Sequence, residues 1–196
     1  MNIIMHMGLA QAIRQATERE LSLRIDRVGF LYGNVAPDIR PGLTNIPHYK
    51  SSAMDFLEAE IVKITSYPLP TTGKWPKQLS ERMGIMTHYL ADFFCYAHSQ
   101  YFQGDLRAHL FYESRLWYDF QRHQKAVKHN WIKPDKILSS AENIITYIEE
   151  RHDWYLDTVR NKHPSYHWDT ATAFSVSVSV CVSMLSICIK NLKIAA

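Results

Sequence analysis

Cysteine is scarce in this sequence. The three that occur, Cys95, Cys181 and Cys188, form no Cys-x-x-Cys pair. An odd number of widely spaced cysteines argues against a disulfide scaffold and against a zinc site built from thiolates. Buried free thiols in a reducing compartment are the default for such residues, so we expect a cytoplasmic protein. The N-terminus has no Lys/Arg-led apolar run before a small-residue cleavage site, and no signal peptide is expected.

Long apolar runs and strong charge are missing as well. The most apolar window, 174–189, is sixteen residues long and contains five serines. A membrane-spanning helix needs about 20 apolar residues, so the sequence predicts no transmembrane segment. The formal charge of +3 provides no basic stripe of the kind that marks a nucleic-acid binder. We therefore expect no stable nucleic-acid partner.

Glycine and proline are also few. The chain has 7 glycines and 8 prolines beside 46% hydrophobic residues, a composition typical of a globular, helix-rich protein. A length of 196 residues predicts a single domain over 1–196, long enough to bury roughly 70% of its unfolded surface. The predicted fold class is all-α, a multi-helix bundle.

Apolar residues repeat with helical spacing along most of the chain. Helices are expected over about 3–16, 23–32, 51–66, 77–98, 105–125 and 134–160. Ser51 or Ser52 is the expected N-cap of the third helix. Residues 35–49 contain three prolines and a glycine and are expected to form a loop, as are residues 67–76.

The last apolar segment fits two patterns. Residues 174–183 alternate with period two, which indicates a strand, but Phe174, Val178, Cys181 and Leu185 also form a helical stripe. No second strand is evident to pair with it, and a lone strand is not stable. We therefore predict a buried final helix.

Ionisable residues interrupt the apolar stretch 88–98, and they are the most informative feature of the chain. Three unpaired ionisable groups in a core helix would cost several kcal/mol, on the order of their desolvation. His88 and Asp92 are four residues apart, so on a helix they share a face and can grip one metal ion. His98 lies about 240° further around such a helix, and is expected to bind a neighbouring ion unless the helix ends or bends.

A second pair with the same spacing follows, His109 and Glu113. Further candidates lie upstream: His6 near the start, and Asp38 and His48 in the proline-rich loop. Imidazoles and carboxylates suit zinc better than magnesium, which prefers oxygen ligands alone. Because one zinc takes about four ligands, this set predicts two or three Zn²⁺ ions.

The order and spacing of these residues resembles the zinc-dependent phospholipase C and S1/P1-type nuclease superfamily. The resemblance covers roughly residues 1–120 and is carried by His6, Asp38, His48, His88, Asp92, His98, His109 and Glu113. It implies an all-α bundle with a trinuclear zinc cleft, acting as a phosphodiesterase. The implied substrate is a phosphate ester, either a phospholipid head group or a nucleotide.

The resemblance also implies how the ligands divide. One zinc would be held by Asp38, His48, His88 and Asp92. A second would be held by His98, His109 and Glu113, with room for water. A third would be held by His6, the bridging Asp92 and the amino group and carbonyl of Met1, where the family has a terminal tryptophan. Asp38 would be the catalytic residue that orients or deprotonates the zinc-activated water, which attacks phosphorus.

Two rival interpretations remain. Arg151-His152-Asp153 suggests an HD-type phosphohydrolase, although adjacent His and Asp on a charged helix are common by chance. The other rival is a non-catalytic or degenerate helical bundle that binds zinc for stability. Structural zinc sites usually have four ligands, often cysteine, whereas a three-ligand site without cysteine favours an open, catalytic ion. The remaining histidines are interpreted as surface or capping residues: His123, His129, His163 and His167.

Overall fold

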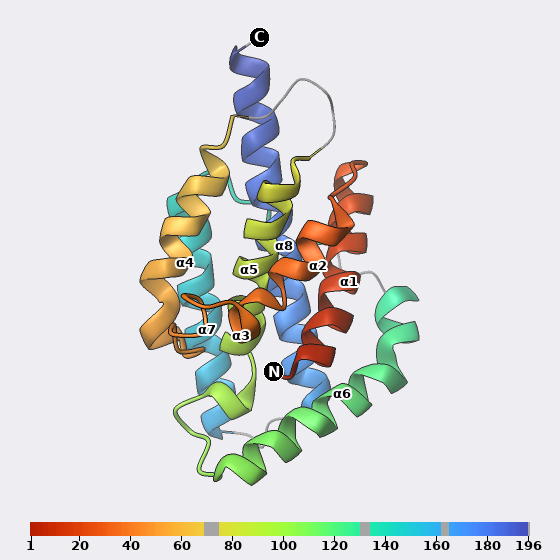
Figure 1. Ribbon diagram of the computed structural model, residues 1–196, viewed down its shortest axis with the longest axis vertical. Coiled ribbons are helices and arrows are strands. Elements are labelled where there is room, and N and C mark those ends of the chain that lie inside the picture. The colour runs from red at the N-terminus through yellow and green to blue at the C-terminus, as the bar shows by residue number, and fades with distance from the viewer. Residues whose placement is uncertain (69–74, 130–133, 162–164, 196) are drawn as a thin grey trace.

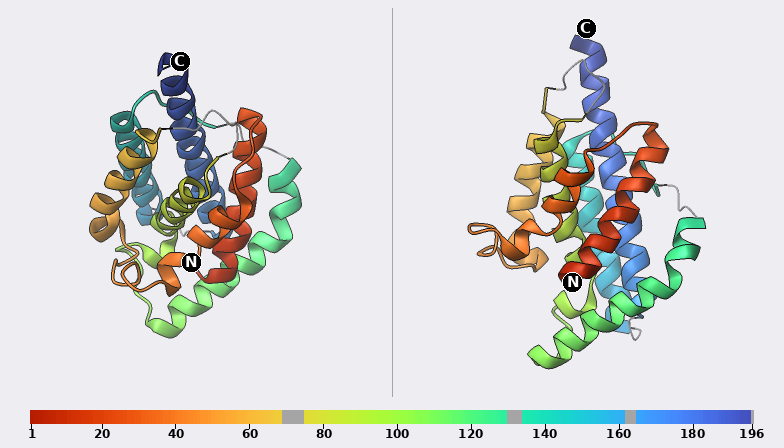
Figure 2. Two further views of the ribbon diagram at one scale, coloured as in Figure 1. Left: turned by 45° about the horizontal axis from the view of Figure 1, so that its top comes forward. Right: turned by 45° about the vertical axis from the view of Figure 1, so that its right-hand side comes forward.

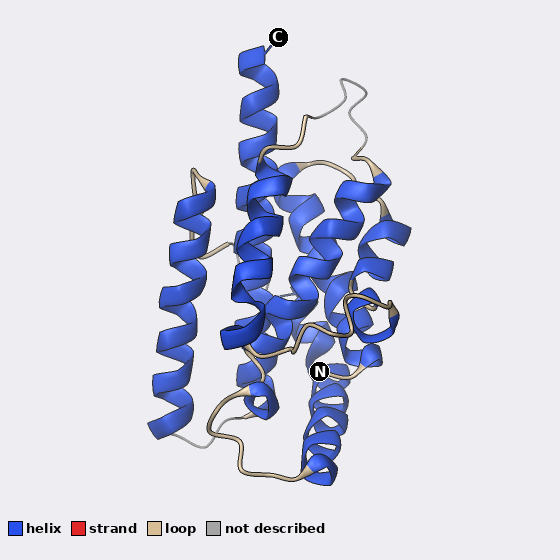
Figure 3. Cartoon of the chain, turned by 60° about the vertical axis from the view of Figure 1, so that its left-hand side comes forward, coloured by secondary structure: helices blue, strands red, loops and turns tan. Residues whose placement is uncertain are grey.

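The computed structural model describes residues 1–68, 75–129, 134–161 and 165–195, and within these ranges all regular structure is helical (Figure 3). The elements are α1 (Ile3–Leu21), α2 (Arg27–Gly33), α3 (Ala36–Ile39), α4 (Lys50–Thr65), α5 (Lys77–Phe93), the 3₁₀ turn η1 (Tyr96–His98), α6 (Leu106–His129), α7 (Ala141–Asn161) and α8 (Tyr166–Ala195). The all-α prediction is confirmed.

Helices α5 and α8 form the centre of the bundle. Helices α4 and α7 cover one side of them and α1 and α2 the other, while α6 crosses the lower end obliquely (Figures 1 and 2). Helix α8 contacts α1, α4, α5, α6 and α7. The N-terminus of the chain lies at the lower end of α5, near α3 and α6 (Figure 1). The bundle therefore brings the beginnings and ends of several helices together at one place.

Helix α8 resolves the ambiguity of the final apolar segment in favour of a helix. Its alternating serines are buried, and two of them accept hydrogen bonds from the segment before α7: Ser179 Oγ accepts from Asp135 N at 3.0 Å, and Ser183 Oγ accepts from Leu138 N at 2.9 Å. The apolar part of this helix is longer than the sixteen residues expected from the sequence. Residues 166–192, 27 in all, are long and apolar enough to cross a membrane. In the bundle, 83% of the most apolar window of α8 is buried, as expected of a core helix.

Several predicted boundaries were wrong. Helix α7 begins at Ala141 rather than near 134, because the preceding residues donate backbone N–H groups to serines of α8 instead of to their own helix. Helix α4 begins at Lys50 with Tyr49 at the N-cap, so neither Ser51 nor Ser52 is the cap. The proline-rich loop contains the short helix α3, and α1 continues to Leu21.

Two glycines allow α2 and α5 to pack unusually closely. A Cβ atom on Gly33 would lie 2.1 Å from the carbonyl oxygen of Glu81 and 2.9 Å from the Cα atom of Gly84. Any larger residue would push the helices apart. This contact places Asn34, the residue after α2, against the polar end of α5, where His88 lies.

Candidate metal centre

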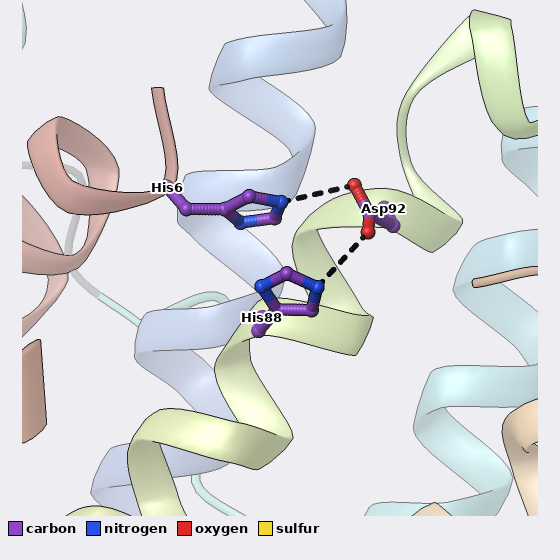
Figure 4. Close-up of side chains that lie close together, drawn as sticks. All are labelled: His6, His88 and Asp92. Carbon is purple, nitrogen blue, oxygen red and sulfur yellow. Dashed lines mark ion pairs between the residues drawn. The ribbon is translucent and has the colours of Figure 1, made fainter. Parts of the chain in front are cut away.

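Helix α5 supplies the centre of the site. His88 and Asp92 are both fully buried, with His88 Nε2 3.4 Å from Asp92 Oδ2. His6 approaches from α1, its Nε2 3.3 Å from Asp92 Oδ1 and its ring stacked on that of His88 with centroids 3.8 Å apart. Figure 4 shows both imidazoles directed at the same carboxylate. Asp92 therefore lies between two histidines from different helices.

Asp38 and His48 reach the same carboxylate from the other side. His48 Nδ1 lies 3.1 Å from Asp92 Oδ2 and 3.5 Å from His88 Nε2. Asp38 Oδ1 lies 3.9 Å from His48 Nδ1 and 3.8 Å from His88 Nε2. Asp38 is on α3 and His48 just precedes α4, so the short helix within the predicted loop positions the first of them.

His98, His109 and Glu113 form the third part of the site. Glu113 Oε1 lies 3.2 Å from His98 Nε2 and 2.9 Å from His109 Nε2. Helix α5 ends at Phe93, earlier than predicted, and the chain turns into η1. This turn brings His98 Nε2 to 3.6 Å from Asp92 Oδ1, which a continuous helix would not allow.

The amino group of Met1 completes the cluster. It contacts Asp92 Oδ1 and lies 2.9 Å from His98 Nε2 and 3.2 Å from Glu113 Oε1. The Met1 side chain is buried in the core, so this end of the chain is fixed. Although burial opposes a charge, the facing carboxylates Asp92 and Glu113 outweigh it and raise the pKa of this amino group to about 11.

The structure thus brings together all nine residues of the sequence-predicted site. Three groups have donor atoms within 4.8 Å of one another: His6, His88 and Asp92; Asp38, His48 and His88; and His98, His109 and Glu113. His88 belongs to two of these groups and His6 stacks on it, a sharing that the resemblance did not indicate.

The residues present fit metal ions by chemistry and by unmet bonding capacity. All side-chain donors are imidazole nitrogens or carboxylate oxygens, the ligand types that zinc takes besides thiolates. Both ring nitrogens of His6, one oxygen each of Asp38 and Asp92, and Nδ1 of His98 are buried without a hydrogen-bond partner. Buried polar atoms are rarely left so, and a cation bound in the cluster would satisfy one ring nitrogen of His6 and the unpartnered oxygen of Asp92.

The charge states of the side chains suit cation binding, whereas the Met1 amino group must lose its proton to become a ligand. Burial alone would raise the pKa of Asp92, but His98, the Met1 amino group and His6 hold it well below its ordinary value. Burial would likewise raise the pKa of Glu113, but its hydrogen bond with His98, together with the charges of the Met1 amino group, His98 and His109, lowers it to about 2. Burial and the neighbouring His6 hold the pKa of His88 well below its ordinary range, so this imidazole is neutral.

Two supporting residues were missed by the sequence analysis. The backbone oxygen of Asn34 lies 2.9 Å from His88 Nδ1 and can accept a hydrogen bond from its N–H group. This leaves the lone pair of Nε2 free for a metal. Asp169 on α8 is fully buried behind the site, where it accepts hydrogen bonds from Tyr96 N, Tyr112 Oη and Tyr155 Oη. No spacing of residues in the sequence indicates the role of Asn34. Asp169 could have been noticed as an acid just before the apolar final segment.

The residues behind the HD-type interpretation take no part in a metal group within the described residues. His152 is buried against Phe93 and Phe94, and burial with the nearby Lys50 lowers its pKa to about 4. Asp153, by contrast, is exposed. Both line a groove of about 240 Å³ that also includes His98. The groove lies beside the cluster, and its lining is Tyr49, Lys50, Ser51, His98, Ser99, Gln100, His152, Asp153 and Leu156.

Comparison with known families gives one match. A family described as "Zinc dependent phospholipase C" matches residues 5–162, which include every predicted ligand except Met1. Neither a comparison with curated proteins nor one with solved structures gives a significant match.

Proposed function

The chain belongs to the zinc-dependent phospholipase C family, and from this premise we propose that it hydrolyses phosphodiesters with water activated by two or three zinc ions. The observation that carries the proposal is the convergence of four imidazoles and an amino group from separate elements on the two oxygens of Asp92. A structural zinc site would need about four ligands, and this cluster offers nine.

The proposed ligand sets are those that the family resemblance implies, and their members lie close together in the cluster. We assign one ion to Asp38, His48, His88 and Asp92, one to His98, His109 and Glu113, and one to His6, Asp92 and the Met1 amino group. Bound zinc supplies a water whose pKa falls toward ~7 and a positive charge for the phosphate oxygens. Asp92 belongs to two of these ligand sets. As a shared ligand it would keep the ions of those two sets close together.

Asp38 is the proposed proton acceptor. Its side chain is 20% exposed, whereas Asp92 is fully buried, so Asp38 faces the solvent side of the cluster. Oδ2 of Asp38 has no hydrogen-bond partner and is free to accept a proton from the attacking water. Burial raises the pKa of Asp38 above its ordinary value, which makes the carboxylate a better base than an exposed one.

The outer face of α6 supports a phospholipid rather than a free nucleotide as the substrate. While His109 and Glu113 face the cluster, the opposite face exposes Phe111 (60%) and Tyr118 (54%), and Leu106 (72%) and Leu110 (54%) are exposed on the side nearer the ligands. The exposed Arg107, Arg115 and Arg122 lie among them, and no acidic residue is exposed on the described part of this face. Apolar and basic residues on one helix face suit an anionic phospholipid surface.

Replacement of Phe111 by serine tests this choice. We expect hydrolysis of phospholipid in anionic vesicles to fall by roughly 10-fold or more, because one apolar contact of about 1.5–3 kcal/mol is lost. Turnover of a soluble chromogenic phosphodiester should be unchanged, since Phe111 is directed away from the cluster. Val28→Ser, a change at an equally exposed residue on α2, is the matched control. Equal losses on both substrates would contradict a lipid-facing role.

Metal counting tests the hydrolase itself. We expect two or three zinc ions per chain at the cluster, and phosphodiester hydrolysis that a chelator abolishes and added zinc restores. Hydrolysis should decline below about pH 6, where protons compete with the metal for histidines. A chain that binds zinc fully but hydrolyses neither lipid nor soluble phosphodiester would instead be the degenerate bundle.

A further inference from the structure

Another group of histidines and a carboxylate lies further along α6, past His109 and Glu113. It is separate from the nine-residue metal centre described above, which is called the main cluster here. Asp119 and His123 are four residues apart on this helix, and His167 on the first turn of α8 approaches them. One donor atom from each residue lies within 4.8 Å of the others. The sequence analysis interpreted both histidines as surface or capping residues, because their proximity depends on how α6 packs against α8.

The contacts within this group leave donors available. His123 Nδ1 lies 2.9 Å from the backbone oxygen of Asp119 and 3.3 Å from its Oδ2 atom. Donation of the Nδ1 proton to that carbonyl leaves the other ring nitrogen, Nε2, with a free lone pair. The His167 ring stands 5.2 Å from the His123 ring, centroid to centroid. Each histidine can therefore offer a nitrogen without displacing a helix.

Asp119 supplies an independent indication that a ligand is missing. Its Oδ2 atom is buried but has no hydrogen-bond partner, although the side chain as a whole is 23% exposed. The unpartnered oxygen lies on the side of Asp119 that faces His123, 3.3 Å from Nδ1 of that ring.

We propose that Asp119, His123 and His167 form a separate site for one Zn²⁺ or a chemically similar transition-metal ion, with water completing the shell. Two imidazoles and a carboxylate suit such an ion and not magnesium or calcium, which prefer oxygen. The bound ion cross-links α6 to the start of α8. Because α6 also carries His109 and Glu113, this cross-link stabilises the helix that presents two ligands of the main cluster.

The test compares zinc binding by His167→Ala, Asp119→Asn and the unaltered protein, with Asp157→Asn as a control at an exposed carboxylate on α7. His167→Ala is the decisive variant because it leaves the Asp119–His123 pair intact. We expect each site variant to bind one zinc fewer per chain at equal free zinc, or to bind it more than ~10-fold more weakly. Added zinc should raise the melting temperature less in the variants than in the control.

The control measurements keep the outcome clear. Circular dichroism shows whether each variant folds, and phosphodiester hydrolysis shows whether the main cluster still works. If His167→Ala and the unaltered protein have the same zinc content and the same melting response, the proposal is overturned and the three residues are only an ion pair beside a histidine. A zinc deficit in His167→Ala with hydrolysis retained supports it, whether or not the hydrolase assignment holds.

Discussion

Replacing Asp92 with asparagine is expected to remove most of the bound zinc and to lower phosphodiester turnover by at least ~10³-fold, equivalent to about 4 kcal/mol of transition-state stabilisation. The reason is that both oxygens of Asp92 are in use. Oδ1 faces His6, His98 and the Met1 amino group, and Oδ2 faces His48 and His88. Asparagine keeps one oxygen but replaces the other with an N–H₂ group, which donates hydrogen bonds and cannot bind a cation.

Zinc content and hydrolysis are both measured for this variant, because each reports a different role. Asp55→Asn, at an exposed acid on α4, is the matched control and should change neither. The fold should survive, since the substitution preserves the volume of the side chain. If Asp92→Asn keeps full zinc content and full turnover, Asp92 does not bridge ions and the proposed arrangement of the centre is wrong.

The local part of this centre was predictable from spacing. His88 with Asp92, and His109 with Glu113, are separated by one helical turn, and this spacing alone places each pair on one face. The fold class also followed from the sequence, since apolar periodicity along the chain indicated helices. The last helix needed the absence of a partner strand to be assigned, because its buried serines imitate a strand pattern.

The convergence of the pairs was not predictable from spacing, because it depends on contacts between distant segments. His98 reaches Asp92 only because α5 ends at Phe93 and the chain turns. Helix α3 positions Asp38, although the prolines around it indicated a loop. The close packing of Gly33 and Gly84 brings Asn34 to His88, and no local pattern indicates that these glycines meet. Only the family resemblance anticipated that these segments share a site.

Asp169 offers a second large effect, at a residue that touches no proposed ligand. Its carboxylate accepts hydrogen bonds from Tyr96 N at 2.8 Å, Tyr112 Oη at 2.8 Å and Tyr155 Oη at 2.9 Å. These donors belong to η1, α6 and α7, so one side chain of α8 joins three other elements. Two of them carry proposed ligands, His98 on η1 and Glu113 on α6.

Asp169→Ala is expected to lower the free energy of unfolding by about 3 kcal/mol or more, because three buried donors lose their acceptor at about 1–3 kcal/mol each. Zinc affinity should fall as well, since η1 is no longer fixed beside Asp92. Urea unfolding and zinc titration measure the two effects. Asp169→Asn keeps one acceptor oxygen and should lose less of both. Unchanged zinc affinity in a destabilised Asp169→Ala protein would limit the residue to a role in folding.

The same residue gives a pH test with a defined sign. Burial raises the pKa of Asp169 from 3.8 to about 6, so the folded state holds this proton more tightly than the unfolded state. The contribution of Asp169 to stability must therefore decrease as the pH rises from about 4 to 6 and stay constant above that range. Asparagine does not titrate, and the difference in stability between the two proteins isolates this group from other acids. In the metal-free protein, we expect Asp169 to exceed asparagine in free energy of unfolding most at the acid end of this range. If that difference in stability does not depend on pH, the carboxyl keeps an ordinary pKa and its three donors fully offset its burial.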